Sequence, residues 1–168
     1  AEVEYLQVIK IWPRKMRAYN NLGVLYYEMK KFKDAENIYG KVLELDPNYI
    51  ETINNLGVLY LAMNKNNDAL RLLQSSKSLD PNRVDTLYYL GITYMSEKDW
   101  GSAQTEFRTA LSLNPKNADI YDRLGILFAR KGKWEKANEA FQSALKLNPS
   151  HQSARTNLKR LENKIRTN

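Results

Sequence analysis

Two pairs of adjacent asparagines, Asn20–Asn21 and Asn54–Asn55, are the polar side chains that most need an explanation in this sequence. Each pair opens the same heptapeptide, NNLGVLY, at residues 20–26 and again at 54–60. A carboxamide offers both a hydrogen-bond donor and an acceptor, as does the main chain of an extended peptide. Because asparagine is a mediocre helix former, its repetition in a helical pattern favours a binding role. The alternative is that the pair is simply part of the repeated structural pattern.

The sequence contains no recognisable catalytic motif. The only histidine is His151, no nucleophile or second ligand forms a recognisable motif with it, and there is no cysteine. Phosphate-binding glycine loops and metal-ligand spacings are also missing. We therefore expect His151 to be a surface residue, and we expect no enzymatic activity, cofactor or metal.

The composition is that of a soluble, folded protein, with 43% hydrophobic and 27% charged residues. No apolar run approaches the roughly 18 residues of a membrane span. Residues 152–168 hold five basic residues against Glu162, so four of the seven net positive charges lie in this tail. The basic balance is therefore mostly a terminal feature, which weakens a nucleic-acid interpretation. The lack of cysteine leaves the redox compartment undetermined.

A period of 34 residues runs through the whole chain. It spaces all five prolines, four glycines and four leucines: Pro13, Pro47, Pro81, Pro115, Pro149; Gly23, Gly57, Gly91, Gly125; Leu22, Leu56, Leu90, Leu124. Each period contains two amphipathic segments of about 12–14 residues with helical spacing. In the first period Leu22 and Tyr26 share one face of helix A, and Tyr39 and Val42 share one face of helix B. Proline then ends helix B.

Glycine in the middle of helix A costs about 0.5–1 kcal/mol relative to alanine. The chain accepts this cost four times at one position of the repeat. We infer a close approach of helices A and B, with Gly23 facing the small side chain of Ala35.

The pattern Leu-Gly-x-x-Tyr, followed by alanine and proline at fixed intervals, resembles the tetratricopeptide repeat. The resemblance implies an all-α fold, a right-handed solenoid of antiparallel helix pairs forming one continuous domain. Residues 1–15 match the second helix of a truncated repeat and 152–168 a C-terminal capping helix with a solvating outer face. The full repeats match at 16–49, 50–83, 84–117 and 118–151.

On each helix A, the side opposite the core should face solvent, yet apolar residues recur there. In the family that the chain resembles, helix A lines a concave groove, so these positions become candidates for binding a peptide. The candidate residues are Asn20, Asn21, Val24, Tyr27, Asn54, Asn55, Val58, Leu61, Tyr88, Tyr89, Ile92, Met95, Arg123, Ile126 and Asn157. Packing against the neighbouring helix A is the alternative for the valines and isoleucines.

Asparagine ladders in similar repeats hold peptide main chain, but here the ladder is intact only in the first two repeats. Tyr88 and Tyr89 replace it in the third repeat, and Asp122 and Arg123 in the fourth. We therefore expect main-chain recognition at one end and side-chain recognition, with tyrosine anchors, at the other.

The expected partner is a protein or peptide, extended and with some apolar side chains. Similar repeats clamp a C-terminal carboxylate with lysine and arginine, but the matching positions here, such as Val24 and Asp85, lack those cations. Counting charges along the groove predicts a mildly acidic lining, which disfavours single-stranded nucleic acid.

Two other functions stay open at this stage. The chain begins in mid-repeat and without Met, so we expect a processed chain or a piece of a longer one. An upstream segment or a second copy would then cover the apolar face around Val3 and Leu6, and the latter would make this a self-assembling module. The repeats could also select substrates for an enzyme in a longer parent chain.

Overall fold

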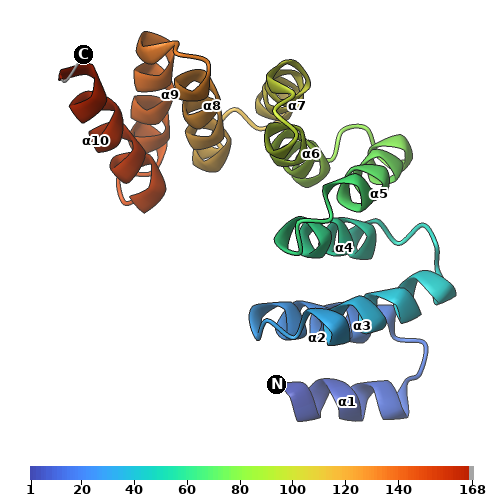
Figure 1. Cartoon of the computed structure of the whole chain (residues 1–168). Coiled ribbons are helices and arrows are strands. Elements are labelled where there is room, and N and C mark those ends of the chain that lie inside the picture. The colour runs from blue at the N-terminus through green and yellow to red at the C-terminus, as the bar shows by residue number, and fades with distance from the viewer. Residues whose placement is uncertain (167–168) are drawn as a thin grey trace. The chain divides into compact units, whose positions relative to one another are not determined.

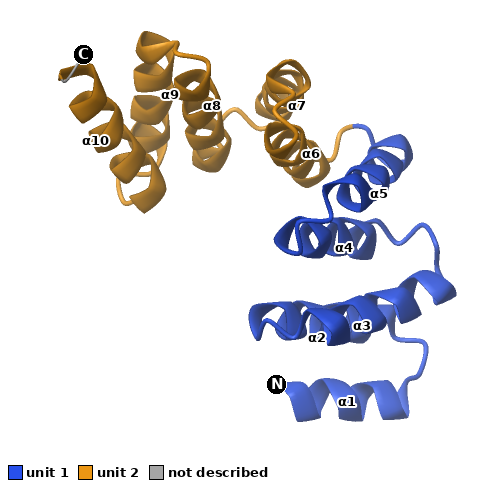
Figure 2. Ribbon diagram, in the orientation of Figure 1, with its two compact units in different colours: residues 1–81 blue, residues 82–168 orange. Residues whose placement is uncertain are grey.

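The computed structural model describes residues 1–166, which form ten α-helices and no strand (Figure 1). The chain divides after Pro81 into two compact units, which are described in turn (Figure 2). The first unit contains α1 (Glu2–Ile11), α2 (Met16–Glu28), α3 (Phe32–Leu45), α4 (Ile50–Ala62) and α5 (Asn66–Leu79). The second contains α6 (Val84–Ser96), α7 (Trp100–Leu113), α8 (Ala118–Arg130), α9 (Trp134–Leu147) and α10 (Gln152–Arg166). One continuous domain stays a prediction.

The predicted all-α repeat solenoid is confirmed. The A helices α2, α4, α6 and α8 have 13 residues each, and the B helices α3, α5, α7 and α9 have 14. Each A helix packs most extensively on the B helix that follows it. Every B helix ends, as predicted, just ahead of a proline, and the extended backbone of the intervening residue stops the helix.

The turn from helix A to helix B has the same backbone conformation in all four repeats. Its second residue after helix A is left-handed, with φ of 58° at Lys30, 58° at Asn64, 61° at Lys98 and 69° at Gly132. In the first repeat the amide of Lys31 donates to the carbonyl of Tyr26, which is a common C-terminal helix cap. Only the fourth turn has glycine at this position, and glycine adopts the left-handed conformation without strain.

A large side chain of helix B covers each repeated glycine of helix A. A Cβ built on Gly23 would lie 2.3 Å from Cε1 of Tyr39, and one on Gly125 would lie 2.4 Å from Cε1 of Phe141. The inferred close approach is therefore correct, but its partner is wrong: Gly23 faces a ring rather than Ala35. The missing Cβ leaves space for that buried ring.

Tyrosines near the end of helix A connect consecutive repeats of the first unit. The hydroxyl of Tyr26 donates to Glu2 on α1 at 2.9 Å, and that of Tyr60 donates to Glu36 on α3 at 2.8 Å. Each bond joins a helix A to the preceding helix B. Burial and the Glu36 hydrogen bond raise the pKa of Tyr60 to about 12.

We predict that Gly23→Ala destabilises the protein by about 1–3 kcal/mol, because the new methyl group overlaps the buried Tyr39 ring. Gly40→Ala is the matched control in the same repeat, since a Cβ on Gly40, in the middle of α3, meets no atom within 4 Å. It should instead stabilise by about 0.5–1 kcal/mol. Urea unfolding followed by circular dichroism measures both. Shifts in the same direction would contradict the steric explanation.

The raised pKa of Tyr60 predicts a loss of stability at alkaline pH. Because the folded state holds this proton more tightly than the unfolded chain, whose tyrosines titrate near pH 10, the contribution is complete below about pH 10. It is lost as the pH rises towards the folded-state pKa of about 12. Urea midpoints of the wild type and of Tyr60→Phe should therefore converge between these values. A constant difference between the two proteins across this range would disprove the assignment.

Candidate functional site

In the first unit, the asparagine pair holds two successive A helices together. The side-chain oxygen of Asn20 on α2 accepts hydrogen bonds from Thr52 at 2.8 Å and from the amide of Asn55 at 3.0 Å, both on α4. Asn20 is 8% exposed and Thr52 is fully buried. The first asparagine of one repeat thus accepts from the second asparagine of the next.

The second unit places different side chains at the same two positions. The hydroxyl of Tyr88 on α6 accepts from Nε of Arg123 on α8 at 3.2 Å. One repeat later, the carboxylate of Asp122 accepts from Ser153 at 2.7 Å and from Asn157 at 2.9 Å, both on α10. Asp122 is only 2% exposed. Tyr88–Arg123 and Asp122–Asn157 are each 35 positions apart, and each pair joins neighbouring A helices.

These contacts correct the expectation that the asparagine side of helix A faces solvent. Asn20 is buried, as is Asn54, which is 4% exposed. The prediction considered only the A–B interface, whereas α2 also packs against α4, and this second interface encloses the first asparagine. Asn21 and Asn55 are half-buried. Peptide binding by Asn20 and Asn54 stays a prediction, and the oxygen of Asn20 is already used within the protein.

The paired tyrosines have mainly packing contacts. The rings of Tyr88 and Tyr89 lie edge to face with centroids 5.3 Å apart, and the Tyr88 ring is 6.2 Å from that of the buried Phe107. Both tyrosines are half-buried. Tyr88 thus contacts α7 through Phe107 and α8 through Arg123, so part of its side chain is already used within the protein.

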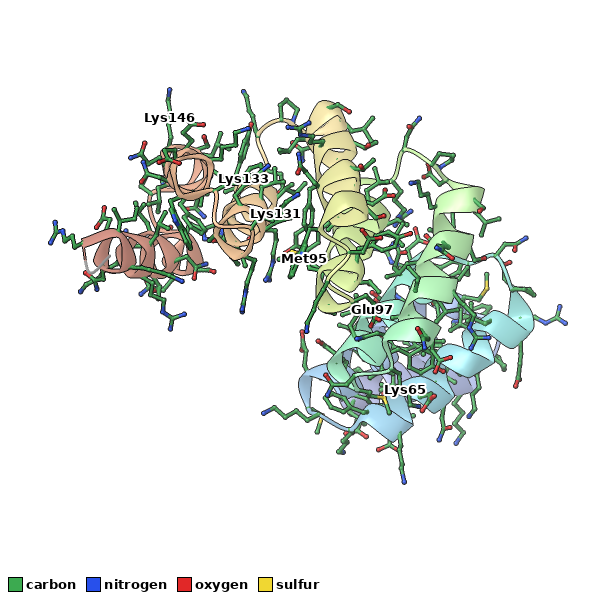
Figure 3. All side chains as sticks on the ribbon, turned by 45° about the horizontal axis from the view of Figure 1, so that its top comes forward. Lys65, Met95, Glu97, Lys131, Lys133 and Lys146 are labelled. Atoms are coloured by element: carbon green, nitrogen blue, oxygen red, sulfur yellow. The ribbon has the colours of Figure 1, made fainter. Side chains whose placement is uncertain are left out.

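Two adjoining clefts follow the A helices of the second unit. The α6–α8 cleft, with a volume of about 340 Å³, is lined by Ile92, Met95, Ser96, Lys98, Trp100, Arg123, Ile126 and Arg130. The α8–α10 cleft, of about 360 Å³, is lined by Ile126, Ala129, Arg130, Trp134, Phe141, Asn157, Arg160, Leu161 and Lys164. Ile126 and Arg130 belong to both. Figure 3 labels Met95, near the end of α6, in the first cleft.

Five predicted site residues therefore lie together along these clefts: Ile92, Met95, Arg123, Ile126 and Asn157. The apolar candidates of the first unit, Val24, Tyr27, Val58 and Leu61, are half-buried on α2 and α4. The Tyr27 ring packs near Phe32, with centroids 5.9 Å apart.

The lining of the two clefts is basic, which corrects the predicted mildly acidic groove for the second unit. Lys98, Arg123 and Arg130 line the first cleft, and Arg130, Arg160 and Lys164 the second, with no acidic residue in either described lining. The count along the sequence failed because Asp122 is buried in a hydrogen-bonded pair and Asp119 lies against His151. Arg160 and Lys164 belong to the segment predicted to be a solvating cap; both are exposed, and both also line the α8–α10 cleft.

Sequence reasoning missed Trp134, Phe141 and Leu161 as lining residues. Trp134 and Phe141 belong to helix B, which the groove prediction ignored. Leu161, on α10, is only 4% exposed. A signal was present, since Asn157, Leu161 and Lys164 follow one another at helical spacing.

His151 is mostly buried, with its side chain 10% exposed, and this corrects its assignment to the surface. Its Nδ1 accepts from the amide of Ala154 at 3.1 Å, which caps the N-terminus of α10. Its Nε2 lies 3.0 Å from a carboxylate oxygen of Asp119 on α8. Asn117, which is 34 positions earlier, caps α8 through the amide of Ile120 in the same way. His151 is therefore a capping residue.

Residues 1–166 contain no group of three side chains suited to holding a metal ion. In the same range, no helix combines the length and the apolar character needed to cross a membrane.

Comparisons with known proteins agree with the repeat architecture. Models of the tetratricopeptide repeat match residues 17–49, 38–71, 84–117 and 118–151. No curated protein matches the sequence. A solved structure of MamA is 28% identical and has a TM-score of 0.72, and the match covers 87% of this chain and 80% of that one.

Two more distant structures share the fold. YrrB, described as a TPR protein with an unusual peptide-binding site, is 19% identical with a TM-score of 0.73, and the match covers 99% of this chain and 86% of that one. A thermophilic TPR protein of Thermus thermophilus is 17% identical with a TM-score of 0.85, and coverage is 95% and 88% respectively.

We predict that Asp122→Ala loosens the docking of α10, because Ser153 and Asn157 lose their shared acceptor. The loss should be about 1–3 kcal/mol. Native-state hydrogen exchange should show faster exchange along α10 than in the wild type. Glu162→Ala, which removes an exposed acid from α10 itself, is the control and should leave the exchange unchanged. Equal exchange in Asp122→Ala and the control would exclude this role for Asp122.

Proposed function

Because the chain belongs to the tetratricopeptide repeat family, we propose that it is a non-catalytic protein-interaction scaffold that binds an extended peptide segment along α6, α8 and α10. The observation that carries this proposal is the pair of adjoining clefts on these helices, which share Ile126 and Arg130. Together they form a strip of apolar floor with polar groups at its edges, which is the usual chemistry of a ligand site.

The apolar residues Ile92, Met95 and Ile126 would take up side chains of the bound segment. Packed helices lie roughly 8–10 Å apart, and an extended chain advances about 3.3 Å per residue. Each A helix would therefore contact about every third residue of the ligand. Arg123 uses Nε within the protein and has other donors for the peptide main chain. Asn157 donates to both Asp122 and Ser153, so it would offer its side-chain oxygen as an acceptor for a main-chain amide.

The equivalent positions of the first unit are proposed as a contact surface of that unit, on α2 and α4. They are Asn21, Val24, Tyr27, Asn55, Val58 and Leu61. Asn20 and Asn54 are omitted because they are buried. Tyr88 and Tyr89 are assigned a supporting role, since Tyr88 positions Arg123.

The structural relatives support a binding rather than a catalytic role. YrrB is described as having a peptide-binding site and shares the fold, although at 19% identity. The match to MamA covers most of both chains. A scaffold needs no reactive group, and the clefts contain none that sequence or structure places in a catalytic arrangement among the described residues.

Self-association is a second candidate, favoured by the surface of α1. None of its residues is buried, and Val3 and Leu6 are 66% and 46% exposed. α10 is a poor acceptor for this helix in the usual A–B geometry, because Lys159 occupies the position of the repeated glycine. Light scattering against concentration tests the idea, and a strict monomer would exclude self-association through α1.

We predict that Ile126→Glu weakens peptide binding at least about tenfold, since it places a charge on the half-buried apolar floor that the two clefts share. Ligands would be selected on the full chain from a phage-displayed random peptide library, and their affinities measured by fluorescence anisotropy. Met95→Glu, at the other end of the α6–α8 cleft, should also weaken them. Gln142→Glu, an exposed position on α9, is the control.

Circular dichroism would first establish that all three variants are folded. Selected peptides that bind Ile126→Glu and Met95→Glu as tightly as the control would refute the groove assignment. Failure to select any peptide would refute peptide binding itself.

A further inference from the structure

The α8–α10 cleft combines an aromatic and aliphatic floor with a rim of cations. Its floor includes Phe141 and Leu161, which are buried, and the half-buried Ile126 and Trp134. Its volume of about 360 Å³ is small for a ligand pocket, which typically has roughly 300–1,000 Å³. The cleft can therefore accept one bulky side chain together with a little of the flanking backbone.

The rim holds three cations from two helices: Arg130 on α8, and Arg160 and Lys164 on α10. No acidic residue belongs to the described lining. Arg130 and Arg160 pair with no carboxylate in residues 1–166. Lys164 places its ammonium 4.8 Å from the centroid of the Trp134 ring, which holds a positive charge at the edge of the floor.

Arg130 and Arg160, gathered beside an apolar surface, favour a ligand of opposite charge. Arginine favours carboxylates, because its planar fork can donate two parallel hydrogen bonds to one carboxylate. Two of the rim cations come from residues 152–168, the segment that holds four of the seven net positive charges as five basic residues against Glu162. The excess charge of the chain is therefore partly directed at this cleft.

We propose that the α8–α10 cleft binds an acidic peptide segment that carries one bulky apolar side chain. The apolar side chain lies on Phe141, Leu161 and Trp134, and flanking aspartate or glutamate side chains pair with Arg130, Arg160 and Lys164. This inference rests on the proposed peptide-binding function and adds the chemistry of the ligand.

A peptide fits the cleft better than single-stranded nucleic acid does. Nucleic-acid grooves offer successive aromatic platforms for stacking bases. Here the described lining has two aromatic rings, of which Phe141 is only 2% exposed, and the ring of Trp134 is already associated with Lys164. Charge complementarity with an apolar anchor is the feature that the observations support.

The probe is a fluorescein-labelled peptide of sequence Gly-Ser-Asp-Glu-Phe-Glu-Asp-Gly-Ser, added to the full chain. Two matched peptides test its two features separately. In one, asparagine and glutamine replace the acids, and in the other alanine replaces phenylalanine. Both should bind at least about tenfold more weakly than the probe. A variant with Trp12→Phe and Trp100→Phe keeps Trp134 as the only indole, so a fluorescence change places the peptide in this cleft.

Charge reversal tests the rim directly. Arg160→Glu should weaken binding of the acidic peptide at least about tenfold, and higher salt should weaken the wild-type complex as well. Lys146→Glu is the control with the same change of charge, since Lys146 is a residue of α9 outside both clefts and projects outward in Figure 3.

Equal binding of the amide peptide, equal effects of Arg160→Glu and Lys146→Glu, or no change in Trp134 fluorescence would each overturn the proposal. Tighter binding of a labelled twelve-residue uridine oligonucleotide than of the acidic peptide would also overturn it. If the acidic probe fails while library peptides still depend on Ile126, only the acidic specificity is wrong. If both fail, the proposed peptide-binding function falls with it.

Discussion

The contact on which each repeat depends is that between a bare glycine Cα and a large side chain of the next helix. Tyr39, Phe107 and Phe141 place their rings, and Leu73 its branched end, where a Cβ of helix A would otherwise stand. This contact fixes the distance between helices A and B and their rotation about their axes. Because the core face of helix A is thereby fixed, its other faces point towards the neighbouring A helix and towards the clefts.

Much of the fold could be predicted from the sequence, because each local pattern recurs with a period of 34 residues. Prolines mark the ends of the B helices and glycines mark the A–B contacts, so even one repeat has the support of the others. The partner of the glycine was misjudged for a physical reason. Helical spacing identifies the face on which a residue lies, but it does not identify the side chain across the interface. Gly23 and Tyr39 lie on two different helices, so the spacing within either helix does not reveal that they fit together.

The site was predicted less well, since a helical wheel treats a helix as having one partner. The A helices also pack on one another, and this second interface encloses residues such as Asn20 and Asp122. The sequence indicated that these polar side chains have a role, and part of that role is to form hydrogen bonds between neighbouring A helices. Among the apolar candidates, Ile92, Met95 and Ile126 line clefts, and their role in binding stays a prediction. The contributions of Trp134 and of the C-terminal cations depend on how α9 packs against α10. The sequence pattern of a single repeat does not predict this packing.

The polar pairs between A helices have a consequence for the order of the repeats. Tyr88 is matched to Arg123, Asp122 to Asn157, and Asn20 to Asn55, so each junction combines a different acceptor with its own donor. The Leu-Gly core is nearly interchangeable between repeats, whereas these junctions are specific to their neighbours. A repeat moved to another position would keep its internal core but would meet a different acceptor or donor on the neighbouring A helix. Each repeat therefore carries its own core, whereas the order of the repeats is encoded in the polar contacts between neighbouring A helices.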